Sequence, residues 1–227
     1  MRSILLCVIS CCLAACSRAP VTHVLFIGNS YTFLNDGIDQ HLKGLAPSTQ
    51  TGLVAVGGAT LKQHWDNSQT RDTIRNGHWD YVVLQEQSQT PVINAKTFHE
   101  GGELLNETIH TGHAQTILLM TWERPDSAKA GVTTEGLAKA YDDLGAELHA
   151  KVAPAGRAFA RSLAERPDFP LLIAADGHPT LAGTYLAACV VYRTIFGTKV
   201  SGNSYCAKGL ASADCAFLQR IADLTLR

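Results

Sequence analysis

Hydrophobic and polar residues alternate along the chain in blocks, and the blocks predict strands separated by helices. Apolar runs of strand length, such as HVLFIG and DYVVLQ, are followed by segments with helical periodicity. The predicted strands are 23–28, 51–58, 80–85, 115–121 and 152–156, and the predicted helices are 34–46, 60–76, 95–112, 134–151, 180–196 and 209–226. This alternation predicts an α/β fold in which helices cover both faces of a mostly parallel, five-stranded sheet.

The N-terminal segment 1–15 has the pattern of a removable leader. A short basic start precedes an apolar run that is too short to span a bilayer comfortably, and small residues precede Cys16. This arrangement resembles a bacterial lipobox, which predicts cleavage before Cys16 and lipidation of that cysteine. An ordinary secretory signal is the alternative. The predicted organisation is a lipoprotein signal peptide at 1–15 and a single domain at 16–227.

The residue after the predicted anchor indicates a destination. Ser17 resembles the residue found in lipoproteins sent to the outer membrane, so we expect a cell-envelope protein that faces the periplasm or the cell surface. The net charge is −1, and no long basic run is present, which argues against a nucleic-acid partner. No later segment is long and apolar enough to be a transmembrane helix. Membrane contact is therefore expected through the lipid alone, and the sequence does not predict an oligomeric state.

Three cysteines remain beyond the predicted anchor, and an envelope location permits a disulfide. Cys206 and Cys215 are close in sequence within a turn-rich tail, so they are the expected pair. Cys189 lies in an apolar helical run and is expected to be a buried thiol. No spacing typical of a zinc site is present. A metalloprotein remains an alternative because His110 and His113 form an H-x-x-H pair, although no third ligand is evident.

Ligands bind at the carboxyl ends of parallel strands, so the residues that follow each apolar run are candidates for chemistry. The first run leads into Gly28, Asn29 and Ser30, where the glycine permits a tight turn and the serine falls near the start of a helix. Ser30 would serve there as a simple helix cap. It would equally serve as a nucleophile whose own N–H helps to hold an oxyanion.

Polar or small residues also follow the next three apolar runs. Gly57 and Gly58 either let backbone N–H groups approach a ligand or form a plain turn. The stretch QEQSQ at 85–89 either offers amides that donate to an oxyanion or is a solvated loop. Trp122 is equally suited to form the base of a substrate pocket and to pack in the hydrophobic core.

The stretch DGHPTLAGTYLAA places Asp176 and His178 in a Gly-Pro turn before an apolar helix. A carboxylate beside a histidine can fix the tautomer that a general base requires. Together with FIGNSYTFLND, VGGATL and VVLQEQS, in this order, the stretch resembles the SGNH hydrolase family, which contains the GDSL esterases. The resemblance extends from about Val24 to about Tyr192.

The resemblance implies a flavodoxin-like three-layer α/β/α sandwich and a serine esterase that works through an acyl-enzyme. Ser30 falls at the family's nucleophile and His178 at its base. The backbone N–H groups of Ser30 and Gly58, with Gly57 as the alternative to Gly58, would hold the oxyanion together with the Gln87 amide. Such a reaction requires no metal or organic cofactor, so none is expected.

The chain departs from the family pattern at two places. The third block usually carries an asparagine as oxyanion donor, where this chain has Gln87, with Gln85 as the second choice. The family's acid usually lies three residues before the histidine, but Ala175 occupies that position. Asp176, two residues before the histidine, is the predicted acid. The alternative is a main-chain carbonyl that orients His178 and leaves a Ser–His dyad.

The expected substrate is a small-molecule or glycan ester with a short acyl group, such as an acetyl ester on polysaccharide or peptidoglycan. This expectation comes from the predicted location and the family. Asn29, Gln85 and Trp122 are the predicted substrate contacts. A catalytically inactive surface lipoprotein that binds a glycan in the same cleft is the alternative, and the two departures from the pattern keep it open.

Overall fold

The computed structural model describes residues 20–226, so the predicted signal peptide and the lipidation site at Cys16 lie outside the described residues. The strands are β1 (Thr22–Gly28), β2 (Thr49–Ala55), β3 (Tyr81–Leu84), β4 (Gln115–Leu119) and β5 (Lys151–Ala153). The α-helices are α1 (Ser30–Phe33), α2 (Gly37–Leu45), α3 (Leu61–Asp66), α4 (Ser68–Asn76), α5 (Thr90–Ile93), α6 (Ala95–Thr111), α7 (Thr134–Glu147), α8 (Ala155–Glu165), α9 (Leu181–Phe196) and α10 (Ser212–Thr225). A short 3-10 helix, η1, spans Ser127–Ala130.

The five strands form one parallel sheet in the order β2-β1-β3-β4-β5, which confirms the predicted α/β class. The chain runs from β1 to β2 on one side and later places β3 on the other side, so the strand order reverses at β1. In flavodoxin-like sheets of this order, ligands bind at the carboxyl ends of the strands next to that reversal. The segments that follow β1, β2 and β3 flank this position.

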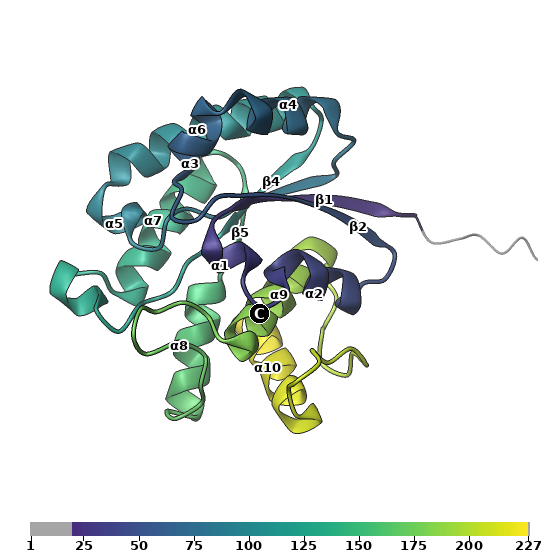
Figure 1. Cartoon of the computed structure of the whole chain (residues 1–227), viewed down its shortest axis with the longest axis vertical. Helices are drawn as coiled ribbons and strands as arrows, with labels where there is room; N and C mark the ends of the chain where they lie inside the picture. Colours follow the sequence, from purple (N-terminus) through teal and green to yellow (C-terminus); the bar gives the residue numbers. More distant parts are fainter. Residues whose placement is uncertain (1–19, 227) are drawn as a thin grey trace, which may run out of the picture.

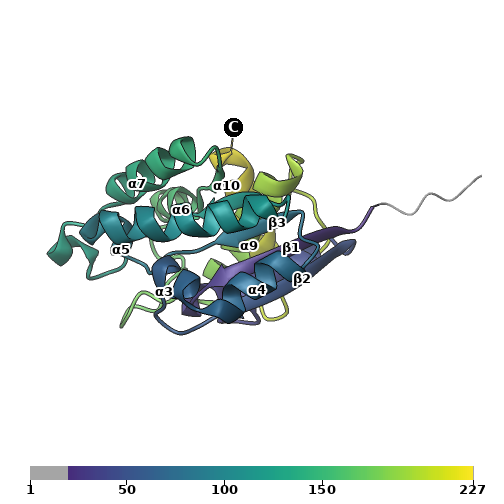
Figure 2. The same cartoon turned by 90° about the horizontal axis from the view of Figure 1, so that it is seen from above.

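Helices cover both faces of the sheet, as the sequence predicts (Figures 1 and 2). One core contains Phe26 of β1 and lies against α1, α2, α8, α9 and α10. The other contains Leu25 of β1 and lies against α3, α4, α5, α6 and α7. Neighbouring strand residues point to opposite faces. A central strand covered on both faces is therefore apolar at successive positions, which gives the continuous run in the sequence.

The helix predicted over 34–46 is divided in the structure. It begins earlier, at Ser30, as the one-turn helix α1, and resumes as α2. Between the two helices, Asn35 and Asp36 have φ values of 55° and 69°. Asn and Asp tolerate this left-handed conformation better than other non-glycine residues, so the turn chemistry outweighs the helical periodicity.

Two further predicted helices differ in their bounds. The helix predicted over 60–76 is split into α3 and α4 at Asn67, whose side chain accepts the N–H of Gln69 and caps α4. The helix predicted over 134–151 ends at Glu147, because Lys151 pairs with β4 as the first residue of β5. Local capping and strand pairing determine where these helices end, and neither interaction can be deduced from the spacing of apolar residues.

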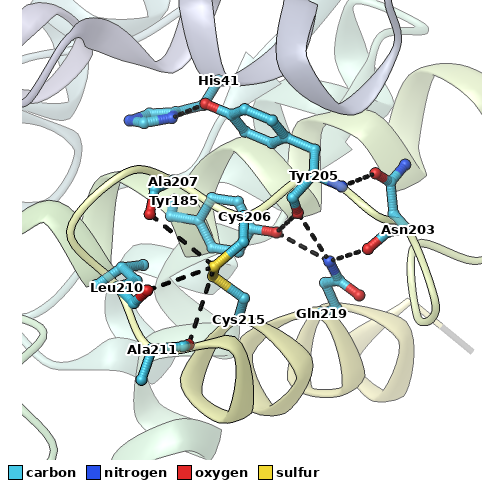
Figure 3. The surroundings of a disulfide bond; sticks show 10 residues. All are labelled: His41, Tyr185, Asn203, Tyr205, Cys206, Ala207, Leu210, Ala211, Cys215 and Gln219. Atoms are coloured by element: carbon cyan, nitrogen blue, oxygen red, sulfur yellow. Dashed lines mark hydrogen bonds between the residues drawn. A yellow bond between two sulfur atoms is a disulfide. The ribbon is translucent and has the colours of Figure 1, made fainter.

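The C-terminal tail is closed by a disulfide between Cys206 and Cys215, which is the predicted pair (Figure 3). Beside it, the Gln219 amide of α10 donates to the carbonyl of Asn203 at 3.0 Å, so the tail is also fastened by hydrogen bonds. Cys189 is a free, buried thiol in α9, also as predicted. Among residues 20–226, no helix combines the length and apolar character needed to cross a membrane.

Candidate active site

Ser30 is the first residue of α1, just beyond the carboxyl end of β1. Asn29 caps this helix by accepting the N–H of Tyr31 at 3.1 Å, and its amide donates to the Ala59 carbonyl at 3.0 Å. The cap thus also ties the serine turn to the loop after β2. Within the described residues, the N–H of Ser30 has no hydrogen-bond partner and remains available to a ligand.

The turn before Ser30 is packed too closely to accept a side chain at Gly28. A Cβ there would lie 2.4 Å from Thr32 Oγ1 and 2.7 Å from Gln85 Oε1. The same Gln85 oxygen accepts the N–H of Asn29 at 3.0 Å and the hydroxyl of Thr32 at 2.8 Å. Gln85 therefore holds the serine turn from beneath, and this explains why an amide directly follows β3.

His178 reaches the serine from a short loop before α9. Leu172 and Pro179 form an isolated antiparallel bridge that closes this loop. Within it, the N–H groups of Ile173 and Gly177 bond to the carbonyls of His178 and Ile173, each at 2.8 Å. Gly177 has a φ of 75°, a conformation that favours glycine. The Gly-Pro turn in the sequence thus becomes a closed loop with His178 near its end.

The structure brings Ser30, His178 and Asp176 into one chain of hydrogen bonds. Ser30 Oγ lies 2.8 Å from His178 Nε2, and Asp176 Oδ2 lies 3.0 Å from His178 Nδ1. An ionised carboxylate can only accept, so Nδ1 carries the proton of the neutral ring. Nε2 is then left to accept from the Ser30 hydroxyl. This is the arrangement that a serine nucleophile and its general base require.

Asp176 holds His178 at two points despite the shortened spacing. Its Oδ1 accepts the backbone N–H of His178 at 3.0 Å while its Oδ2 faces the ring. These backbone and ring hydrogen bonds, aided by the charge of Arg124, hold the pKa of Asp176 below its ordinary value. The carboxylate therefore stays ionised at neutral pH. The position of the usual family acid, Ala175, is exposed and takes no part in this contact.

The loop after β2 presents an open backbone. Gly58 has a φ of 70°, and its N–H has no partner among the described residues. A Cβ on Gly57 or on Gly58 would meet nothing within 4 Å. A hollow of about 360 Å³ adjoins this backbone, and its lining residues are Val56, Gly57, Gly58, Ala59, Gln63, His64 and Asn67.

The Gln87 side chain is anchored through its oxygen. Oε1 accepts the N–H groups of Gln89 and Thr90 at 3.0 and 3.2 Å, whereas Nε2 donates to Ser88 Oγ at 3.1 Å. The second proton on Nε2 remains uncommitted. Gln85 likewise donates one hydrogen bond through Nε2, to the Glu86 carbonyl, but its side chain is buried beneath the serine turn, whereas Gln87 is partly exposed. Gln87 is therefore the better candidate of the two for donation to an oxyanion.

Comparisons with known proteins agree with this geometry. No family model matches the chain, and no curated protein matches it. A candidate SGNH hydrolase from Slackia heliotrinireducens is 28% identical, with a TM-score of 0.67 over 77% of this chain and 99% of that one. In both its sequence blocks and its fold, the chain resembles the SGNH hydrolases. The family resemblance carried by the sequence blocks is thereby confirmed.

Two other solved structures share this fold at lower identity. A DUF4886 family protein from Bacteroides uniformis is 16% identical, with a TM-score of 0.74 over 91% of this chain and 95% of that one. A catalytic mutant of an acetylxylan esterase from Geobacillus stearothermophilus is 16% identical, with a TM-score of 0.58 over 78% of this chain and 95% of that one.

The predicted substrate contacts lie beneath the site, which corrects the sequence-based assignment. Asn29, Gln85 and Trp122 are only 3%, 1% and 1% exposed. The first two support the serine turn. Trp122 is stacked between the rings of Tyr31 and Phe159, with centroids 4.5 and 4.3 Å away. Its Nε1 donates to the Gly177 carbonyl at 3.2 Å, so the core role left open for Trp122 is the one found.

Two buried ionisable residues beside the site were not singled out from the sequence. His64 of α3 bonds through Nε2 to the Gly28 carbonyl at 2.7 Å, and burial lowers its pKa. Glu86 is fully buried between the loops that follow β2 and β3. A signal for Glu86 was present, since it lies two residues after Leu84 and alternation predicts that both point to the same face.

The H-x-x-H pair gains no third ligand. Among residues 20–226, the group of three side chains that could hold a metal ion is His99, Glu103 and Glu147, on α6 and α7. His110 and His113 are not part of it, and both are exposed at the end of α6.

Proposed function

We propose that this protein is a serine esterase that hydrolyses carboxylic esters through an acyl-enzyme. The observation that carries the proposal is the 2.8 Å contact between Ser30 Oγ and His178 Nε2, with Asp176 on the opposite ring nitrogen. A serine that merely caps a helix has no need of an oriented histidine. The alternative of an inactive glycan-binding protein does not account for this contact.

In the first half of the proposed reaction, His178 Nε2 takes the Ser30 proton as Ser30 Oγ attacks the ester carbonyl. The carbonyl oxygen becomes an oxyanion, to which the N–H groups of Ser30 and Gly58 and the Gln87 amide would donate. Collapse of this intermediate expels the alcohol, which takes its proton from His178. Asp176 stabilises the imidazolium that exists between the two transfers.

In the second half, a water molecule takes the place of the alcohol. His178 removes a proton from that water as its oxygen attacks the acyl group on Ser30. The same donors receive the second oxyanion, and His178 returns its proton to Ser30 Oγ as the acid departs. Each protein group ends in its starting state, so the cycle requires no redox partner.

The hollow beside Gly58 favours a small substrate group. Its volume of about 360 Å³ lies at the lower end of the range for ligand sites, about 300–1,000 Å³. An acetyl or other short acyl group, or a single sugar unit, is of suitable size. The acetylxylan esterase among the fold neighbours adds support for an acetyl ester on a carbohydrate.

The test is hydrolysis of p-nitrophenyl acetate by the purified protein beside Ser30→Ala and His178→Ala. We expect each substitution to lower kcat by roughly 10⁴-fold or more, because either loss removes the activated nucleophile. Wild-type turnover that survives Ser30→Ala would exclude the proposal. If the wild type is inactive on this ester, a panel of acetylated glycans is the second arm, and inactivity on that panel also would exclude it.

A further inference from the structure

Glu86 is an ionisable group in the interior with no cation beside it. Its exposed fraction is 0%. Among residues 20–226, it takes part in none of the ion pairs. Burial of an unpaired carboxylate is costly, so a position that served only packing would favour an apolar side chain. Its hydrogen bonds indicate what it does there.

The two carboxylate oxygens of Glu86 bond to two different loops. Oε1 accepts the N–H of Gln87, in the loop after β3, at 2.6 Å. Oε2 accepts the N–H of Leu61, the first residue of α3, at 3.2 Å. One side chain therefore bridges the segment that carries Gln87 and the segment that carries Gly58. These are the segments with two of the proposed oxyanion donors.

The chain between Leu61 and Gly58 is held firmly enough to transmit a displacement. Thr60 caps α3 in a reciprocal pair with Gln63, each side chain accepting the other residue's backbone N–H. The Ala59 carbonyl is fixed by the Asn29 amide at 3.0 Å. A shift of Leu61 would therefore strain the Ala59–Asn29 hydrogen bond and change the position of the adjoining Gly58.

We propose that Glu86 is a positioning residue whose bridge sets the spacing of the Gly58 and Gln87 loops, so that both donors face one oxyanion. The inference rests on the proposed function, since the spacing matters only if these loops hold an oxyanion. Donors stabilise the developing charge fully only at hydrogen-bond distance, so a small displacement of either loop should lower the reaction rate substantially.

The neighbouring elements leave Glu86 without a compensating charge. Tyr141 of α7 is close enough to Glu86 for the carboxylate charge to raise the pKa of its hydroxyl, although burial is the main cause of that rise. On α3, Lys62 is turned toward Asp66 at 2.6 Å and toward Glu100 of α6 at 3.8 Å. His64, also on α3, is bonded to the Gly28 carbonyl instead.

Because of this burial, the bridge is expected to depend on pH near neutrality. Burial, partly offset by the two N–H donors, raises the pKa of Glu86 to about 7. Above that pH the carboxylate accepts both N–H groups. Below it, a proton occupies one oxygen and weakens one side of the bridge. Activity is therefore expected to decrease as the pH falls through about 7 and Glu86 becomes protonated.

The test compares wild type with Glu86→Gln, which keeps the size but offers one acceptor where two are needed and does not titrate. With p-nitrophenyl acetate at pH above 8, we expect kcat to fall by roughly ten- to a hundred-fold, with KM changed by less than about twofold. As the pH falls through about 7, log(kcat/KM) should decrease with a steeper slope in wild type than in Glu86→Gln, because only wild type has a carboxylate to protonate at this position.

Thr116→Val is the matched control for a purely structural effect. It removes a buried hydrogen bond, 2.6 Å from Thr116 Oγ1 to Asn106 Oδ1, near the start of β4 and away from the carboxyl edge. We expect it to lower stability while kcat and the slope remain unchanged. A Glu86→Gln variant that lowers stability alone, like this control, would overturn the proposal.

The remaining outcomes are also decisive. If Glu86→Gln does not fold, Glu86→Asp takes its place, because its shorter side chain cannot reach the N–H groups of both Leu61 and Gln87, and an unchanged kcat in that variant overturns the inference. Loss of activity in Ser30→Ala combined with unchanged kinetics in Glu86→Gln would remove this inference and leave the proposed function standing. Where p-nitrophenyl acetate is a poor substrate, the rate at which a fluorophosphonate labels Ser30 gives the same comparison. If wild-type Ser30 is not labelled, both this inference and the proposed function are overturned.

Discussion

The serine turn and the histidine loop are held by opposite means. The residues that support Ser30 are buried, with Asn29 and Gln85 only 3% and 1% exposed, and Gly28 leaves no room for a side chain. At the other end, 51% of the Asp176 side chain and 31% of the His178 side chain remain exposed. The nucleophile is thus fixed by close packing, whereas the base is fixed by a few hydrogen bonds beside solvent.

This difference implies unequal tolerance to substitution. A close-packed turn cannot relax around an added atom, so a small steric change should move Ser30 out of reach of His178. A solvent-exposed loop can exchange a lost hydrogen bond for water. Substitutions in the turn that carries Ser30 should therefore lower activity more than substitutions in the loop that carries His178.

The largest expected effect is that of Gly28→Ala. The added Cβ would lie within 3 Å of both Thr32 Oγ1 and Gln85 Oε1, so the turn must move. We expect kcat to fall by roughly 10²- to 10³-fold and the free energy of unfolding to fall by about 1–3 kcal/mol. Gly136→Ala in α7 is the control, because its Cβ would come no closer than 3.4 Å to Thr133 Oγ1, and it should be nearly neutral. Equal activities of the two variants would remove the contrast.

A smaller effect is expected at Asp176. Asp176→Asn keeps an acceptor for the His178 backbone N–H but turns an amide toward the ring, which favours the wrong tautomer. We expect kcat/KM to fall by about 10²-fold, less than the ~10⁴-fold known for a buried triad aspartate, because water reaches this carboxylate. Asp176→Ala, which lets water approach Nδ1, should be less harmful than Asp176→Asn. Near-normal activity of both variants would indicate a Ser–His dyad oriented by a main-chain carbonyl.

The smallest effect concerns the link between the two ends. The Asn35 amide donates to the Pro179 carbonyl and to Thr184 Oγ1, each at 2.9 Å, and so joins the segment after α1 to the histidine loop. Asn35→Gly keeps the left-handed backbone and removes both bonds. We expect a decrease in kcat of about fivefold, equivalent to about 1 kcal/mol, with KM unchanged.

Asp36→Gly is the matched control for Asn35→Gly. Asp36 has a similar backbone conformation, with a φ of 69°, and makes no side-chain capping bond. It should leave kcat unchanged. A similar loss in both variants would mean that backbone freedom, rather than the link to the histidine loop, produces the effect.

The central strands β1, β3 and β4 could be predicted because both of their faces are covered, and their apolar runs record that burial directly. Ser30 could be named because it follows the apolar run that forms β1. Asp176 and His178 could be named because their block resembles that of the SGNH hydrolases, although the apolar run before them forms no strand of the sheet. Their meeting depends on a loop closed by the bridge between Leu172 and Pro179, which no periodicity reports.

The assignments that required correction concern polar residues that point inward. QEQSQ is polar throughout in the sequence, yet Gln85 and Glu86 are buried and support neighbouring loops, while Gln87 is partly exposed. The direction of each side chain depends on what the adjacent loop offers it, such as the N–H groups of Asn29 and Leu61. Those partners come from other parts of the chain and become visible only in the fold.

The central claim is that Ser30 is a nucleophile acylated during turnover. The most direct measurement is mass spectrometry of the protein quenched during reaction with p-nitrophenyl acetate, followed by location of the modified residue. We predict an acetyl group on Ser30, formed in a burst of about one nitrophenolate per chain, and none in Ser30→Ala. Turnover without an acyl group on Ser30, or an acyl group on another residue at the same rate, would contradict the claim.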